Sequence, residues 1–255
     1  MLVIFMKESL QPALEEMYSQ RCNLLHMDET YWPAAHEYSG NCIVSSLFHN
    51  LETELYPKSL GLKYVASGEE TYYINGKRHA VSAGKYLLVN QTMPTLEVVI
   101  KEKDTLGICV NIEGELLNDV LQQLVEPDNP DAAANFRQFC LSPELLVREV
   151  TAGPEMKLFM NRLVRASYHK SYSGPPLELV FELTVLLVKE NLDLVSSYFK
   201  LRTSKISTRK ELFQRLLLGK AVLDDSVFSS ISIKEVAETS CLSEFHFYRL
   251  FRQCF

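Results

Sequence analysis

The sequence predicts an α+β multidomain protein, with a small N-terminal β-barrel, a helical middle and a C-terminal all-helical unit. Three observations predict this class. Short apolar segments separated by Gly or Asn turns fill residues 22–112, the hydrophobic period becomes helical after Glu113, and two capped helices lie near the C-terminal end. The 255 residues are 47% hydrophobic, which is enough for a sizeable core.

The β-rich part follows a short helix predicted at residues 8–20. Its clearest feature is Asn75-Gly76 between two alternating segments, because a type I′ hairpin turn needs a positive φ at both central residues. Gly84 marks the next turn. Strands are expected at residues 41–51, 61–67 and 86–90. Many short strands with such turns indicate a small barrel or sandwich.

The helical middle opens with the amphipathic residues 114–125. A polar, proline-bearing connection is expected at residues 126–135. Helical patterning then continues over residues 142–150, 154–169 and 176–201. The last of these helices is too apolar to be solvated on every side, so it is either a buried core helix or an interface.

Charge is divided unevenly along the chain. The net charge of residues 1–199 is −10, whereas that of residues 200–255 is +4. A basic C-terminal part on an acidic body is expected when only that part meets a polyanion. Residues 202–211 are predicted to be a basic linker, with the next helix starting near Thr208.

Two helix starts define the C-terminal motif. Ser232 and Glu235 have the spacing of a capping box, and Ser243 can cap a second helix. A turn near residues 240–242 separates the two helices, which is the helix-turn-helix arrangement. Ala237 is small at the place where the two helix axes must cross closely.

The second helix of this motif carries two stripes of side chains at helical spacing. The first should face the core and consists of Phe247, Leu250, Phe251 and Cys254. The second lies nearly opposite and consists of Phe245, Tyr248, Arg249 and Arg252. Arginine can donate to guanine and aromatic rings can pack on thymine methyls, so the second stripe suits a major groove. The alternative is that the aromatics pack against another element of the protein and the arginines are merely solvated.

Residues 231–255, ISIKEVAETSCLSEFHFYRLFRQCF, resemble the first helix-turn-helix of the AraC/XylS family of bacterial transcription regulators. The matching positions are, in order, Ala237, Ser243, Phe247, Arg249, Leu250, Phe251 and Arg252. The preceding residues 208–227 resemble the leading helix of the same domain. Residues 61–90 resemble the cupin-like N-terminal barrel of the family, in architecture more than in motif.

The resemblance implies how the chain is divided and what it meets. Residues 1–113 would form a cupin-like sensor barrel, residues 114–201 a helical linker and possible dimerisation region, and residues 207–255 the first unit of the DNA-binding domain. The implied partners are double-stranded DNA, a small-molecule effector and a second copy of the chain. A cytoplasmic protein without a membrane partner is expected, because no apolar run approaches the roughly 20 residues that cross a bilayer.

The family pattern also implies roles for single residues. The positions that reach base edges are Phe245, Tyr248 and Arg249, and Arg252 would meet a backbone phosphate. Ser243 and Ser232 hold helix starts, whose N–H groups can face phosphates.

Two departures from the family pattern matter. Cys241 occupies a turn position that is usually Gly in the family, and Gly is favoured where φ is positive. The family's DNA-binding domain holds two helix-turn-helix units, of which this sequence contains one, so Cys254 and Phe255 are expected to pack poorly. The alternative function is that of a truncated sensor or a partner-binding protein that does not bind DNA.

Catalysis and metal binding find little support in the residue pattern. The six cysteines and six histidines lack the tight spacing of zinc ligands, including the pairs Cys22/His26 and His36/Cys42. No phosphate-binding or nucleophile-elbow motif is present. We therefore expect no catalytic residue, no metal and no cofactor, and a cupin-type enzyme is the weakest of the three functional alternatives.

The polar residues of the predicted barrel have structural explanations. His79 is expected to be exposed on a hairpin, and the pair Glu69-Glu70 to lie in water at a strand end. His36 and His49 could face the barrel cavity, although a histidine in an apolar stretch is usually a hydrogen-bonded structural residue. Four barrel tyrosines permit an apolar or aromatic ligand but equally suit strand packing: Tyr64, Tyr72, Tyr73 and Tyr86.

Overall fold

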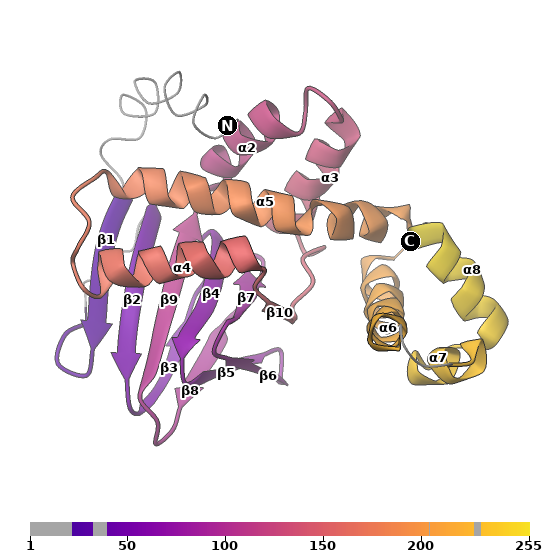
Figure 1. The fold of residues 1–255 in the computed structure, drawn as a ribbon, viewed down its shortest axis with the longest axis horizontal. Helices are drawn as coiled ribbons and strands as arrows, with labels where there is room; N and C mark the ends of the chain where they lie inside the picture. Colours follow the sequence, from indigo (N-terminus) through magenta and orange to yellow (C-terminus); the bar gives the residue numbers. More distant parts are fainter. Residues whose placement is uncertain (1–21, 33–39, 204, 227–230) are drawn as a thin grey trace.

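The computed structural model describes residues 22–32, 40–203, 205–226 and 231–255 (Figure 1). The helix predicted at residues 8–20 and the residue His36 lie outside the described residues. The predicted α+β class is confirmed, because a β-rich N-terminal part is followed by helices.

Two sheets face each other in the N-terminal part. The six-stranded sheet has the order β1-β2-β9-β4-β7-β10, and the four-stranded sheet has the order β3-β8-β5-β6. Strand β1 runs parallel to β2, and the other pairs are antiparallel. The strands are β1 Cys22–Asp28, β2 Asn41–Phe48, β3 Leu51–Leu55, β4 Leu60–Ser67, β5 Glu69–Ile74, β6 Lys77–Ser82, β7 Lys85–Val89, β8 Leu96–Ile100, β9 Thr105–Ile112 and β10 Glu149–Thr151.

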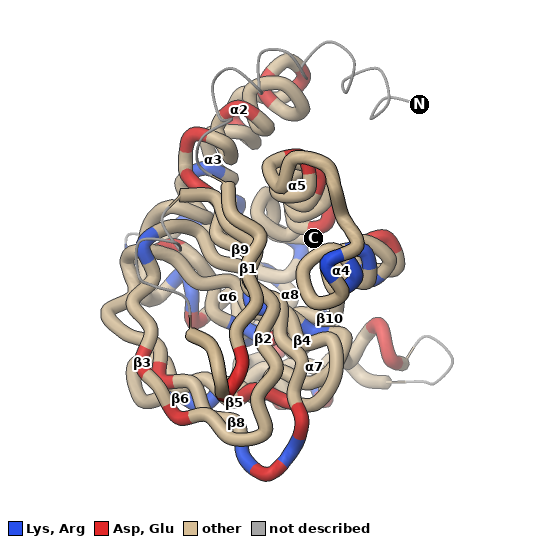
Figure 2. The backbone as a smooth tube through the Cα atoms, turned by 90° about the vertical axis from the view of Figure 1, so that its left-hand side faces the viewer, with Lys and Arg blue, Asp and Glu red and all other residues tan. Residues whose placement is uncertain are grey.

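Helices cover the outer face of the six-stranded sheet. Figure 1 shows α4 and α5 lying across this sheet, and Figure 2 shows the four-stranded sheet on the side away from them. The helices are α2 Gly114–Leu124, α3 Pro130–Leu141, α4 Pro154–Ser167, α5 Pro176–Lys200, α6 Ile206–Asp225, α7 Ile233–Thr239 and α8 Glu244–Cys254.

One hydrophobic core continues from the sheet to the last helix. It includes Ile43 of β2, Leu183 of α5, Leu216 of α6 and Phe247 of α8, all of them buried. A second, smaller core lies between the two sheets and contains Val65 of β4. The alternation of side chains along each strand places successive residues in one core or the other.

The predicted Asn75-Gly76 hairpin is confirmed. The φ angles are 51° at Asn75 and 74° at Gly76, and the turn joins β5 to β6 in a continuous antiparallel ladder. Both values lie in the left-handed region that a type I′ turn requires.

The connection predicted at residues 126–135 is wrong in its second half, because α3 begins at Pro130. Asn129 caps this helix, and its side-chain oxygen accepts a hydrogen bond from the Ala132 N–H at 3.0 Å. Proline is tolerated at the first helical position, where its missing N–H would have no partner in the helix. The alanines that follow favour helix.

The helix predicted over residues 142–150 is also wrong. Ser142 ends α3 in an extended conformation, and β10 then pairs with Lys85–Leu87 of β7. This pairing satisfies backbone groups along β7 that would otherwise lack partners. Leu145 and Leu146 are both buried although they are adjacent, so their apolar character does not report a helical face.

The long apolar helix α5 is a core helix of its own chain. Its buried positions are Leu177, Leu179, Val180, Leu183, Thr184, Val185, Leu187, Val188, Asn191, Val195, Ser197 and Tyr198. Of the two alternatives given above, burial in the core of its own chain explains why this helix is so apolar. Helix α6 begins at Ile206, slightly before the predicted Thr208.

The prediction that the last residues pack poorly is wrong for Cys254. This residue is fully buried, and its carbonyl accepts a hydrogen bond from Lys200 Nζ at 3.0 Å. Phe255 is exposed, although its ring stacks on Phe213 with ring centroids 5.9 Å apart. Gln253 donates to the carbonyl of Lys200 at 2.6 Å. The end of α8 is thus covered by α5 and α6.

Candidate functional site

Local capping produces the helix-turn-helix where it was predicted. Ser232 Oγ accepts from the Glu235 N–H at 3.2 Å, and the Glu235 carboxylate accepts from the Ser232 N–H at 2.8 Å. These two hydrogen bonds form the predicted capping box of α7. The N–H and the hydroxyl of Ser232 each donate to the Glu235 carboxylate at 2.8 Å, and these two hydrogen bonds lower the pKa of Glu235. Ser243 caps α8 by accepting from the His246 N–H at 3.4 Å.

Close packing of three helices holds this motif together. A Cβ atom at Gly219 of α6 would overlap Ser240 Oγ and the ring of Phe247, so α6 reaches α8 only because this residue is Gly. Ala237 is buried in α7, as predicted from its small size. The predicted core stripe of α8 is confirmed for Phe247, Leu250 and Cys254, which are buried.

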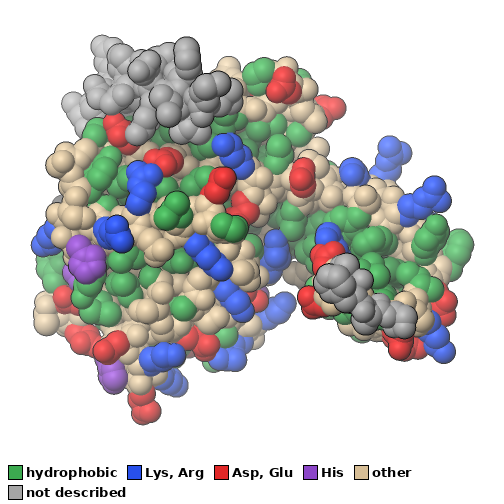
Figure 3. All heavy atoms as spheres, in the orientation of Figure 1, with side chains coloured by type: hydrophobic (Ala, Val, Ile, Leu, Met, Phe, Trp, Pro, Cys, Tyr) green, Lys and Arg blue, Asp and Glu red, His purple; other side chains and the backbone are tan. Residues whose placement is uncertain are grey.

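The opposite stripe of α8 faces water. Phe245 is 78% exposed and Tyr248 is 56% exposed, while Arg249 and Arg252 are also exposed. Figure 3 shows hydrophobic and basic side chains together on the outer edge of the lobe that contains α8. Neither arginine has an ion pair with any of the residues that the structure describes. Within the described chain, therefore, no element covers the aromatic rings of this stripe.

The turn between α7 and α8 contains a left-handed residue other than Gly. Cys241 has a φ of 52°, which is the conformation expected at the position that the family reserves for Gly. A left-handed residue with a Cβ costs roughly 1–2 kcal/mol.

Cys241→Gly should therefore raise the free energy of unfolding by about 1 kcal/mol, less the backbone entropy that Gly adds to the unfolded chain. Urea unfolding measures the change. Cys241→Ala is the control, because it removes the thiol but keeps the Cβ. An equal gain for both variants would trace the effect to the thiol and contradict the conformational explanation.

A second group of polar side chains lies between the two sheets. Lys63 of β4 and Cys109 of β9 are direct cross-strand partners, and Lys63 Nζ lies 2.7 Å from Cys109 Sγ. From the other sheet, Glu70 accepts a hydrogen bond from Tyr72. A Cβ at Gly107 would overlap the Glu70 carboxylate, so the Gly makes room for it.

The prediction that Glu70 lies in water is wrong, because it is 5% exposed whereas Glu69 is exposed. The alternation of β5 turns the second glutamate inward. Burial raises the pKa of Glu70, although the Tyr72 hydrogen bond and the charge of Lys63 act in the opposite direction.

A raised carboxyl pKa in the folded state makes the charged form unfavourable, so stability is lost as the pH rises through that pKa. Glu70→Gln should remove this loss and flatten the pH dependence of the unfolding free energy above the acid range. Thermal unfolding across pH measures it, with Glu69→Gln as the exposed control. A Glu70→Gln profile parallel to that of the unmodified chain would contradict this account.

The predictions for the barrel histidines need correction. His79 was expected to be exposed, but it is buried, with 3% of its surface exposed, and its Nδ1 lies 2.7 Å from a Glu149 carboxylate oxygen. His49 does not face a cavity, because it is exposed and lies 2.9 Å from Asp104. Across the part of the chain that the structure describes, no cluster of His, Cys, Asp or Glu could hold a metal ion.

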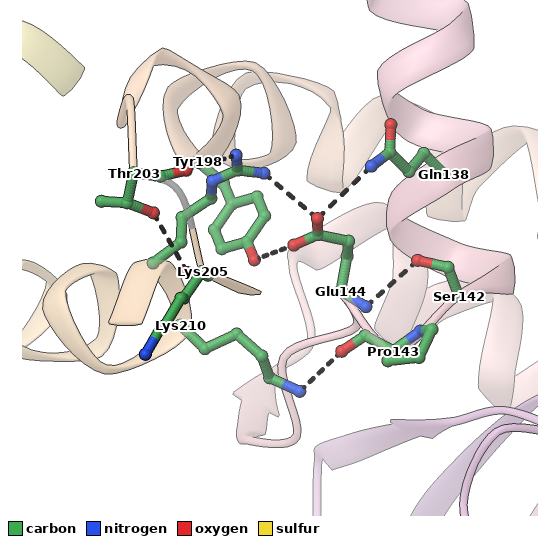
Figure 4. A network of polar contacts seen from close by, with 9 residues as sticks. Gln138, Ser142, Pro143, Glu144, Tyr198, Thr203, Lys205 and Lys210 are labelled. Atoms are coloured by element: carbon green, nitrogen blue, oxygen red, sulfur yellow. Dashed lines mark hydrogen bonds and ion pairs between the residues drawn. The ribbon is translucent and has the colours of Figure 1, made fainter. Parts of the chain in front are cut away.

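A buried ion pair joins the barrel side of the molecule to α6 (Figure 4). Glu144, in the segment after α3, lies 3.1 Å from Arg209 of α6, and their side chains are 3% and 18% exposed. The same carboxylate accepts hydrogen bonds from Tyr198 of α5 and Gln138 of α3. Lys210 adds a 2.9 Å hydrogen bond to the carbonyl of Pro143. Two stretches that are distant in sequence, one with Gln138 and Glu144 and the other with Tyr198 and Arg209, thus meet at one carboxylate.

Sequence reasoning missed Lys63, Cys109, Glu144 and Arg209. For Lys63 there was a usable signal, since the alternation of residues 60–67 places it on one face with Gly61 and Val65. For the others the pairing depends on elements far apart in the chain.

The family model that matches the chain covers most strands of the N-terminal sheets. Residues 57–149 match the family model of the AraC-like ligand binding domain, which confirms the recognised resemblance for this part of the chain. No curated protein matches the chain in sequence. In the described part of the chain, no helix is long and apolar enough to cross a membrane.

Several solved structures are similar to the chain. ToxT from Vibrio cholerae, bound to (E)-4-(8-methylnaphthalen-1-yl)but-3-enoic acid, has 9% identity and a TM-score of 0.38, and the match covers 83% of this chain and 94% of ToxT. The AraC-like transcriptional activator CuxR has 12% identity and a TM-score of 0.36, with 77% and 61% covered. A cupin protein from Bacteroides fragilis has 14% identity and a TM-score of 0.26, with 29% and 67% covered. At these TM-scores the superpositions carry no argument, and the family model alone relates residues 57–149 to AraC-like ligand binding domains.

Proposed function

We propose that this chain, whose residues 57–149 match the model of the AraC-like ligand binding domain, is a cytoplasmic transcription regulator that binds double-stranded DNA through α8. In this proposal residues 1–113 sense a small molecule, residues 114–201 link the two activities, and residues 207–255 bind DNA. The observation that carries it is the uncovered stripe of two aromatic rings and two arginines on a capped helix. Such a stripe suits base edges and thymine methyls in a major groove.

The assigned roles follow the geometry of α8. Phe245, Tyr248 and Arg249 would contact base edges, and Arg252 a phosphate. Ser232 and Ser243 cap α7 and α8, so the backbone N–H groups in the first turns of these helices would lie near phosphates of the DNA backbone.

Arg249→Ala should weaken binding to the specific site by about 1–3 kcal/mol and relax the preference at one base pair. Arg252→Ala should weaken binding to specific and scrambled duplexes equally and reduce the salt slope by about one. Fluorescence anisotropy with DNA from upstream of the chain's own gene, titrated with salt, measures both. Equal losses on specific and scrambled DNA for Arg249→Ala would contradict its assignment.

The helix-turn-helix of α7 and α8 by itself neutralises few phosphates, so the affinity that it supplies at cellular salt would be low. We propose that two copies associate and recover affinity through effective concentration. Sedimentation of the chain with and without duplex tests this. A monomer that binds no DNA at low salt would favour the alternative of a sensor or partner-binding protein without DNA binding.

The polar interior of the barrel is the proposed effector site. Lys63, Glu70 and Tyr72 offer charged and hydrogen-bonding groups beside the apolar core that contains Val65 and Val98. A bound effector would therefore combine an apolar body with a polar group. A rise in melting temperature with such a compound, lost in Lys63→Met, would support the site.

A further inference from the structure

Lys63 and Cys109 place a nitrogen and a sulfur atom unusually close together. The Nζ–Sγ distance is 2.7 Å. That value is at the short end even for N–H···O hydrogen bonds. Sulfur has a larger radius than oxygen, so an N–H···S hydrogen bond is ordinarily longer. The separation instead matches two atoms that are joined through a single oxygen atom.

The sheet holds this pair in register. Lys63 and Cys109 are directly opposite each other on the antiparallel strands β4 and β9, so their side chains leave the same face. Asn111 lies two residues further along β9, donates to Cys42 Sγ at 3.2 Å, and has its oxygen 3.8 Å from Cys109 Sγ. The thiol of Cys109 is thus confined on one side by Asn111 and on the other by Lys63.

The solvent exposure and the charged neighbours of Lys63 and Cys109 also suit an oxidation at this pair. Lys63 and Cys109 are half-buried, so a small oxidant or reductant can reach them, whereas Cys42 is fully buried. Burial acts to lower the pKa of Lys63, but the neighbouring Cys109, Glu70 and Cys42 outweigh it and raise the pKa.

We propose that Lys63 and Cys109 form a reversible covalent cross-link in which one oxygen atom joins Nζ to Sγ. Dioxygen is the oxidant. After the ammonium group has released a proton to solvent, the amine and the thiol each lose one hydrogen. One oxygen atom of dioxygen forms the N–O and O–S bonds, and the other leaves as water with both hydrogens. Nitrogen and sulfur are oxidised and dioxygen is reduced. Two molecules of a dithiol reverse the step, giving amine, thiol, water and two cyclic disulfides.

The cross-link would change the barrel in two ways. It removes the positive charge of Lys63 from the space that also holds Glu70, and it ties β4 to β9. Neither effect depends on DNA binding, so this inference stands or falls separately from the proposed DNA binding. The cross-link would also remove the Lys63 ammonium group from the proposed effector site.

Mass spectrometry of the full chain tests the cross-link. Cleavage after glutamate leaves Lys63 in residues 55–69 and Cys109 in residues 103–113. In protein kept in air, we expect one linked species, whose mass is the sum of the two peptides plus one oxygen and less two hydrogens. Dithiothreitol should convert it to the two separate peptides.

Three variants sharpen the test. Cys42→Ser should keep the linked species, because it removes a neighbouring thiol and leaves the pair intact. Lys63→Arg and Cys109→Ser should lose it. The melting temperature should fall on adding dithiothreitol for the unmodified chain and Cys42→Ser, but not for Lys63→Arg. Separate peptides in air, a Cys42–Cys109 disulfide, or oxygen added to Cys109 alone would each overturn the proposal.

Discussion

Replacing Glu144 with alanine should lower the free energy of unfolding by about 3–5 kcal/mol. The carboxylate is the centre of a buried network, and without it Arg209 keeps its charge but loses its ion-pair partner. The Arg209 guanidinium also lies 5.6 Å from the centre of the Tyr198 ring and 5.4 Å from that of Phe199, so it cannot swing into water without losing those contacts. Removing one partner of a buried ion pair therefore lowers the free energy of unfolding by more than the intact pair contributes to it.

A matched control exists on the surface. Arg162 and Glu182 form an ion pair at 2.7 Å whose side chains are 48% and 27% exposed. Arg162→Ala should cost only about 0–1 kcal/mol, because water solvates the remaining charge. Urea denaturation of both variants gives the comparison. A loss below 1 kcal/mol for Glu144→Ala would show that water reaches Arg209 and that the network is not closed.

A double variant separates charge from packing. Glu144→Leu combined with Arg209→Met removes both charges and leaves apolar groups in their place. It should recover much of the stability lost in Glu144→Ala, because replacing a buried pair by apolar side chains is often neutral. If the double variant is as unstable as the single one, packing rather than the unpaired charge is the cause.

Phe247→Ala should cost about 3–5 kcal/mol, whereas Phe245→Ala should change stability by about 0.5 kcal/mol or less. The two residues are neighbours on the same helix and differ only in what surrounds them. Phe247 is fully buried against α6 and stacks on Phe251 with ring centroids 5.1 Å apart, while Phe245 is 78% exposed. The thermal unfolding of the two variants measures this contrast.

The same pair separates folding from DNA binding. Phe245→Ala should fold normally and still lose affinity for DNA, because the exposed ring is proposed to contact bases. Circular dichroism and anisotropy on the same samples give both quantities. If Phe245→Ala binds DNA as well as the unmodified chain, the exposed stripe of α8 is not the surface that contacts the bases.

Short-range patterns predicted the local structure well. The Asn75-Gly76 turn, the Ser232–Glu235 capping box and the Ser243 cap depend on a few adjacent residues, and each forms as expected. The stripe of α8 could be placed for the same reason, since helical spacing alone separates its buried face from its exposed one.

The errors occurred where distant segments decide the outcome. Residues 142–150 become extended because β7 offers an edge, and no local signal in SPELLVREV shows this. His79 is buried because Glu149 of β10 is its partner, and Glu70 is buried where Gly107 of β9 leaves room for its carboxylate. The end of α8 is contacted by Lys200 and Phe213, which come from α5 and α6.

One apolar core joins the six-stranded sheet to α8, so the barrel and the helix-turn-helix are packed together and are not independent units joined by a linker. They should melt together, giving a single heat-absorption peak, and their slowest amides should exchange with solvent at a common rate. A signal from the barrel would then reach α8 as a small sliding of packed helices against α5, rather than as a change in the freedom of a tether.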